Sequence, residues 1–82
     1  MHYTYKTHGT CSALIEFDLS DGIINNVSFH GGCHGNLQGI AKLAEGMKAS
    51  ELITRLSGIR CGFKQTSCPD QFAEAIKTAL AQ

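Results

Sequence analysis

The chain has 82 residues, 43% hydrophobic and 17% charged, and its seven basic and seven acidic side chains cancel. This length predicts one domain, residues 1–82, with a core thin enough that small domains like it often add a disulfide, a metal or a partner subunit. The balanced charge disfavours nucleic-acid binding, and no apolar run is long enough for a membrane span or a signal-peptide core, so we expect a cytoplasmic protein.

The first third of the chain alternates apolar and polar residues, as half-buried β-strands do. A short strand near Tyr3 and Tyr5 precedes two longer strands that are joined by the turn signal Ser20-Asp21-Gly22. The side chains expected on the core face of the long strands are Ala13, Ile15, Phe17 and Leu19 on the first, and Ile23, Val27 and Phe29 on the second. The side chains expected on the solvent face include Glu16, Asp18, Asn26, Ser28 and His30.

The length of the turn sets the register of this hairpin. We expect a three-residue loop, with Gly22 in the left-handed conformation of a bulged turn. A two-residue loop would instead set the apolar residues of one strand against the polar residues of the other. The preferred register places Leu19 opposite Ile23 and Cys11 opposite Gly31. It therefore predicts that Cys11 and Cys33 are neighbours at the open end of the hairpin.

After Gly31 the apolar period becomes helical. The first predicted helix carries the stripe Leu37, Ile40, Ala41, Ala44 and Met47 and stops at Gly46; the second, near 50–56, buries Leu52, Ile53 and Leu56 and stops at Gly58; the third buries Phe72, Ala73, Ile76 and Leu80. Cys68 is the expected N-cap of the third helix, with Pro69 at its first position and Asp70 at the positive end of its dipole. The predicted fold class is α+β, a small antiparallel sheet covered on one face by three helices.

Four cysteines, Cys11, Cys33, Cys61 and Cys68, lie at the ends of loops and the starts of helices. Helix N-termini favour the thiolate, which is the form that binds metals and attacks disulfides. Four sulfurs at one end of the domain suit a tetrahedral zinc ion or an iron–sulfur cluster. Because no C-x-x-C pair is present, redox thiols, inert buried thiols and disulfides stay open as alternatives.

Histidines offer further ligand candidates. His34, beside Cys33, is the best non-sulfur candidate, whereas we expect His2, His8 and His30 to face solvent. No Ser/His/Asp set or carboxylate pair stands out, and the glycine-rich segment at 31–39 lacks the lysine of a P-loop. We therefore expect no catalysis by this domain alone.

The segment from Thr66 to Asp70 reads T-S-C-P-D and resembles the motif that names the TSCPD domain. That domain is found at the C-terminus of adenosylcobalamin-dependent ribonucleotide reductases and as small stand-alone proteins. The segments 31–47, 51–62 and 66–76 extend the similarity over nearly the whole chain. The resemblance implies that the four cysteines are those of the family, that the domain is an accessory one, and that its partner is a ribonucleotide-reductase-type protein.

The sequence is also similar, over fewer features, to the iron–sulfur cluster assembly scaffold family. In that family one cysteine lies on the strand before a hairpin, one leads into a helix and one opens the final helix; Cys11, Cys33 and Cys68 occupy these places. The similarity implies an iron–sulfur-scaffold-like topology. Ser12 replaces the usual aspartate and Cys61 is additional, which suggests a site that retains its metal.

Three functions follow from these patterns. The preferred one is a metal-binding accessory module that holds zinc or an iron–sulfur cluster through the four cysteines. The second is a thiol redox accessory to a ribonucleotide-reductase-type enzyme, in which Cys61 and Cys68 cycle between dithiol and disulfide. The third is a metal-free interaction domain. An exposed strand edge near Tyr3 and Tyr5 also suggests a homodimer.

Overall fold

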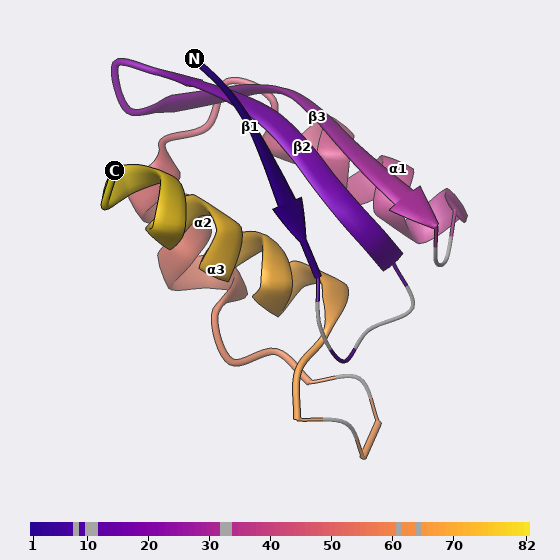
Figure 1. The fold of residues 1–82 in the computed structure, drawn as a ribbon. Coiled ribbons are helices and arrows are strands. Elements are labelled where there is room, and N and C mark those ends of the chain that lie inside the picture. The colour runs from indigo at the N-terminus through magenta and orange to yellow at the C-terminus, as the bar shows by residue number, and fades with distance from the viewer. Residues whose placement is uncertain (8, 10–11, 32–33, 61, 64) are drawn as a thin grey trace.

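The computed structural model describes residues 1–7, 9, 12–31, 34–60, 62–63 and 65–82, and they form an α+β fold (Figure 1). The elements in chain order are β1 (His2–Lys6), β2 (Ser12–Ser20), β3 (Ile23–Gly31), α1 (His34–Ala44), α2 (Ala49–Leu56) and α3 (Cys68–Leu80). The strands form one antiparallel sheet in the order β1-β2-β3. The predicted fold class is confirmed, including the N-terminal strand.

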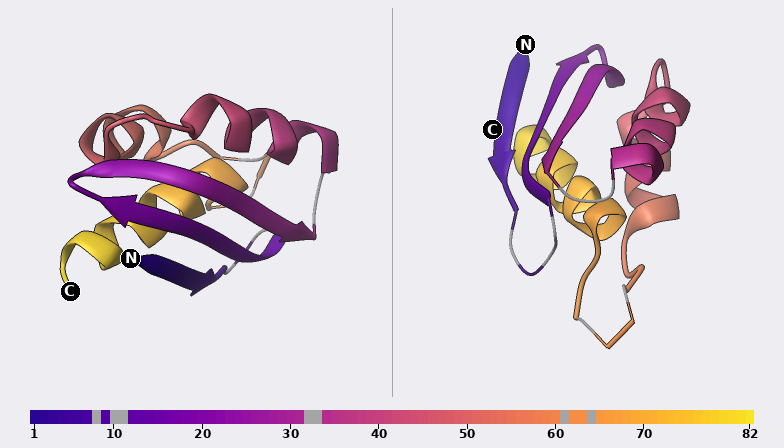
Figure 2. Two further views of the ribbon diagram at one scale, coloured as in Figure 1. Left: turned by 90° about the horizontal axis from the view of Figure 1, so that it is seen from above. Right: turned by 90° about the vertical axis from the view of Figure 1, so that its right-hand side faces the viewer.

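The three helices lie on one side of the sheet (Figure 2). α3 crosses beneath β2, α1 lies along β3, and α2 packs against α3. Gly46 and Gly58, where the helical stripes were predicted to stop, both adopt a positive φ just beyond α1 and α2. Glycine reaches this conformation without the steric cost that a Cβ imposes, so it ends a helix readily. None of the helices in the described part of the chain is long and apolar enough to cross a membrane.

The core lies between the sheet and α3. Its largest fully buried side chains are Phe17, Phe72, Ile15, Ile24 and Ile76. Phe72 meets the rings of Phe17 and Phe29 edge-on, with centroid distances of 5.8 and 5.5 Å. Such edge-to-face contacts add to the burial of apolar area.

Four side chains differ in burial from the predicted core. Ile24, rather than Ile23, is fully buried, Ala13 is exposed, and Leu80 is 49% exposed because it lies in the last turn of α3. The exchange between Ile23 and Ile24 follows from the turn that precedes them, because a change of one residue in register moves every side chain to the other face.

The predicted three-residue loop is wrong. Ser20 pairs with Ile23, so the loop is Asp21-Gly22, and both residues have positive φ (53° and 77°) as a type I′ hairpin turn requires. The apolar faces still match because the register shifts between Glu16 and Asp18, next to Asn26, whose φ is 54°. A β-bulge of this kind adds one residue to one strand.

Beyond the bulge Ile15 pairs with Phe29, and a second shift places Ser12 opposite Gly31. Two predicted pairs are therefore wrong. Gly31 pairs with Ser12 rather than with Cys11, and Leu19 pairs with Ile24 rather than with Ile23. The open end of the hairpin therefore carries the start of β2 beside the end of β3.

Candidate functional site

The first turn of α3 is held by a serine rather than by a cysteine. Ser67 is the N-cap, and its hydroxyl accepts a hydrogen bond from the backbone N–H of Asp70 at 3.1 Å. The same hydroxyl donates to the carbonyl of Ile59 at 2.6 Å. The prediction that Cys68 caps the helix is wrong, because a hydroxyl oxygen is a much better acceptor than sulfur. Cys68 is the first helical residue and Pro69 the second.

Asp70 joins the start of α3 to the segment that leaves α2. One carboxylate oxygen accepts from the backbone N–H of Gly58 at 2.7 Å, and the other accepts from the hydroxyl of Thr66. The side-chain amide of Gln71 donates to that hydroxyl oxygen at 3.2 Å. The bond from Thr66, followed by that from Gly58, lowers the pKa of Asp70 below its ordinary value. Asp70 therefore ties the 57–67 loop to α3.

Cys68 is buried, with 8% of its surface exposed, and opens α3. The backbone N–H groups of the first turn of a helix have no partners within the helix, and they carry the positive end of its dipole. Chemically, Cys68 can bind a metal ion or take part in thiol exchange.

Three of the four predicted ligands, Cys11, Cys33 and Cys61, lie outside the described residues. The structure does describe the elements that flank them. Figure 1 and the left view of Figure 2 agree that the start of β2, the end of β3 and the first turns of α1 and α3 lie at the same end of the molecule, opposite the β2–β3 turn. Each of the four cysteines adjoins, or lies on the loop into, an element at that end.

Gly9, which lies between β1 and β2 in the sequence, contacts the segment that leads into α3. A Cβ placed on Gly9 would lie 3.1 Å from the Cγ2 of Thr66, so the backbone there packs against the residues that lead into α3. Among the described residues, no group of three or more His, Cys, Asp or Glu side chains is arranged to hold a metal. His8 and the side chain of His34 lie outside the described set.

A polar cluster that sequence reasoning missed lies on the open face of the sheet. The imidazole of His2 contacts Asp18 through Nδ1 at 2.7 Å and Glu16 through Nε2 at 3.1 Å, while His30 contacts the other oxygen of Glu16 at 2.5 Å. Both histidines are exposed, as predicted. The β1–β2 register, which the sequence pattern does not fix, places His2 opposite Asp18. Without that register, the sequence could not assign partners to His2.

These contacts shift the titration of the cluster. The hydrogen bond that His2 donates to Glu16, followed by the one to Asp18, raises the pKa of His2 above 6.5. The bond from His2 and then that from His30 lower the pKa of Glu16. The amide of Asn26, bonded at 2.6 Å, and then His2 lower the pKa of Asp18. The cluster thus favours a protonated His2 between two carboxylates.

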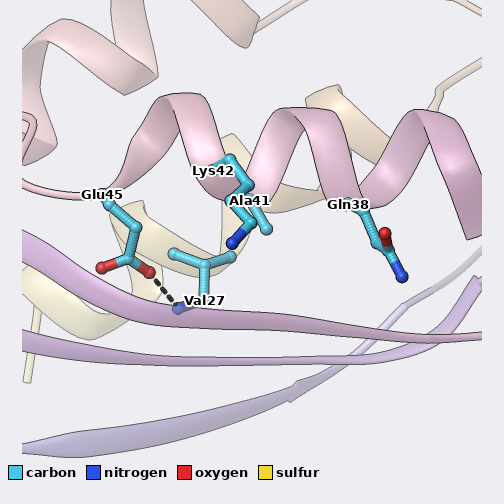
Figure 3. A pocket seen from close by; sticks show the side chains of 5 residues that line it. All are labelled: Val27, Gln38, Ala41, Lys42 and Glu45. Carbon is cyan, nitrogen blue, oxygen red and sulfur yellow. Dashed lines mark hydrogen bonds between the residues drawn. The ribbon is translucent and has the colours of Figure 1, made fainter.

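A shallow pocket between α1 and β3 is lined by Val27, Gln38, Ala41, Lys42 and Glu45 (Figure 3). Glu45, just beyond α1, directs its carboxylate at the edge of β3, where it accepts from the backbone N–H groups of Asn26 and Val27 at 2.9 Å each. The carboxylate of Glu45 therefore binds the two backbone N–H groups at the β-bulge. We assign this pocket a structural role.

Comparison with known proteins gives one family. The model of the TSCPD domain matches residues 3–80, which is nearly the whole chain. No curated protein and no solved structure matched the chain.

Proposed function

Because this chain belongs to the TSCPD domain family, a small accessory domain associated with ribonucleotide reductases, we propose that it is a metal-binding accessory module. In this proposal Cys11, Cys33, Cys61 and Cys68 together hold one zinc ion or one iron–sulfur cluster. Its partner would be a ribonucleotide-reductase-type protein, to which the module contributes no catalytic group of its own.

One observation carries the proposal. The elements that adjoin the four cysteines meet at one end of the molecule, and the described cysteine there, Cys68, is buried at the start of a helix. A thiol at the positive end of a helix is a good metal ligand once it is deprotonated.

The set of donors fits a thiophilic metal. Four thiolates suit a closed tetrahedral zinc site or an iron–sulfur cluster, whereas magnesium and calcium prefer oxygen ligands. When bound, zinc would supply folding free energy, and a cluster would supply the capacity to carry an electron. The hydrogen bonds of Ser67 and Asp70 fix the first turn of α3, and hence the backbone of Cys68, without help from the metal.

The position of Cys68 also favours the second candidate, a thiol redox accessory, because a thiolate at a helix start attacks disulfides readily. In that case metal-free protein would gain a disulfide between Cys61 and Cys68 on mild oxidation. Titration of thiols before and after oxidant distinguishes the two functions. Loss of two thiols in protein that never contained metal favours the redox role.

The decisive experiment is elemental analysis with an ultraviolet–visible spectrum on protein purified without oxygen or chelator. We expect about one zinc ion per chain with no visible absorption, or iron with a broad visible band. Cys68→Ser and Cys33→Ser should each lose the metal and lower the melting temperature together. Ser67→Ala is the matched control, since it removes the N-cap beside Cys68 and should lower stability while the metal content stays unchanged. Protein without metal, or cysteine variants that retain it, would refute the proposal.

A further inference from the structure

β1 presents an uncovered edge of the sheet. Met1 and Leu19 exchange both of their backbone hydrogen bonds at 2.9 Å, and the N–H of Thr7 donates to Ala13 at 3.1 Å. In an antiparallel pair, bonded and non-bonded residues alternate along the strand. The odd-numbered residues of this segment therefore bind β2, and the N–H and C=O groups of the even-numbered ones point away from the sheet.

The even-numbered residues are His2, Thr4 and Lys6. No backbone group of theirs has a hydrogen-bond partner among the described residues. Figure 2 shows β1 as the outermost strand of the sheet, on the side away from α1 and α2. The edge is therefore a row of donors and acceptors that another strand can bind.

The first half of the opposite edge, along β3, is covered. The N–H of Ile24 donates to Met47 at 2.9 Å, its carbonyl accepts from Gly46 at 2.7 Å, and the carboxylate of Glu45 covers the N–H groups at the bulge. The chain thus covers residues 24–27 of its β3 edge with its own residues, whereas no described residue covers its β1 edge. The asymmetry indicates that β1 has a partner outside the chain.

We propose that β1 pairs with β1 of a second copy, antiparallel and centred on Thr4, so that two sheets join into one. With Thr4 opposite Thr4, His2 lies opposite Lys6 of the second copy, and Lys6 opposite its His2. Every outward N–H group of the two strands then meets a carbonyl. Sliding the strands by two residues leaves one residue of each copy unpaired, so this register is the preferred one.

The side chains complement each other in the same register. His2 is held by Glu16 and Asp18, so two carboxylates lie beside it on the open face of the sheet. Lys6, which has no ion-pair partner among the described residues, would lie beside these carboxylates in the second copy. On the core face the half-buried Tyr3 would lie opposite Tyr5 of the second copy, a favourable cross-strand aromatic pair. This self-complementarity favours a second copy over a foreign strand.

Sedimentation equilibrium of the full chain tests the proposal, with Thr4→Pro as the variant and Thr4→Ala as its matched control. Proline removes the central outward N–H, which the chain itself does not use, and edge strands tolerate proline at such positions. We expect a wild-type dimer, an unchanged dimer for Thr4→Ala, and a dissociation constant raised at least about tenfold for Thr4→Pro. Lys6→Glu should also weaken the dimer, and it keeps the test valid if the proline variant does not fold.

Amide hydrogen exchange locates the interface. As the protein concentration rises, the N–H groups of Thr4 and Lys6 should become protected, while those of Tyr3 and Tyr5, bonded to β2, are protected throughout. A monomer at the highest soluble concentration would overturn the proposal. The proposal would also be overturned if both Thr4→Pro and Lys6→Glu still formed the dimer and the wild type showed no added protection at Thr4. The dimer interface would then lie on another surface.

Discussion

At the scale of single residues, the five-residue motif that begins α3 is largely explained by its hydrogen bonds. Ser67 caps the helix, Pro69 stands where no N–H is needed, and Asp70 binds both Thr66 and the backbone of Gly58. These four side chains build a rigid start for the helix. Cys68, the first residue of the helix, lies between these residues in the sequence and is buried.

Asp70→Asn tests the structural part of the motif. The substitution removes the charge from an acceptor of two hydrogen bonds, so we expect a loss of about 1–2 kcal/mol in the free energy of unfolding. Urea unfolding followed by circular dichroism measures it. Asp21→Asn, in the exposed hairpin turn, is the control and should change stability little, because asparagine also tolerates a positive φ. Equal effects of the two substitutions would contradict the role given to Asp70.

The effect of Asp70→Asn should also depend on pH. The folded state lowers the pKa of Asp70 from 3.8, so its contribution is present above that value and is lost as the pH falls through the lower folded pKa. The difference in stability between wild type and variant should therefore shrink in acid. If the difference in stability between wild type and variant stayed constant down to the lowest pH at which the protein folds, the charge of Asp70 would not be the cause of the effect.

At the scale of elements, the sheet has one strand that depends on few contacts. β3 is covered by α1 and by residues 45–47, whereas β1 is attached to β2 alone through its backbone bonds. On the core face Tyr3 stacks on Phe17 at 5.7 Å, and on the open face His2 binds two carboxylates of β2. Detachment of β1 should therefore be the easiest partial unfolding of this fold.

Raising the pH should loosen β1. The folded state raises the pKa of His2 above 6.5, so its stabilising contribution is present below pH 6.5 and is lost as the pH rises through the folded value. Both tyrosines of the chain, Tyr3 and Tyr5, lie in β1 and there is no tryptophan, so tyrosine fluorescence reports this strand alone.

The measurement is a thermal melt by tyrosine fluorescence at several pH values, at a concentration where the chain is monomeric. The melting temperature should fall between about pH 6 and pH 8 in the wild type. It should change much less in His2→Gln, which keeps hydrogen-bonding capacity but does not titrate. A wild-type profile no steeper than that of His2→Gln would show that the ion pairs of His2 do not hold the strand.

At the scale of the whole molecule, a few aromatic side chains join the sheet to α3. An 82-residue chain has a free energy of unfolding of roughly 4–12 kcal/mol. Phe72 is fully buried and its ring meets those of Phe17 and Phe29, which lie on two different strands. The loss of one such side chain is comparable with the stability of the entire fold.

Phe72→Ala should therefore cost about 3–5 kcal/mol, a large part of the free energy of unfolding. Phe63→Ala is the matched control, because the Phe63 side chain is fully exposed and its removal should leave stability unchanged. Far-ultraviolet circular dichroism with urea compares the two variants with the wild type. A Phe72→Ala variant as stable as Phe63→Ala would contradict the placement of α3 on the sheet.

Much of the fold could be predicted from local signals. The helical period from Leu37, the stops at Gly46 and Gly58 and the alternation in β1 and β2 each depend on residues a few positions apart. The register between strands, which joins segments far apart in the chain, could not be predicted from such local signals. The apolar pattern disfavours a two-residue turn unless a β-bulge restores the match of the apolar faces. The bulge at Asn26 does this, but it has no strong local signature in the sequence.

The candidate site also has features that the sequence predicts and features that only the tertiary structure decides. The sequence by itself determined the family motif and the start of α3 near Cys68, because these depend on residue type and short spacing. Only the tertiary structure decided that Ser67 rather than Cys68 caps the helix, that His2 lies between Glu16 and Asp18, and that one sheet edge is covered and the other open. Those outcomes depend on which of several competent partners comes within hydrogen-bonding distance, and only the packing of residues far apart in the chain selects among them.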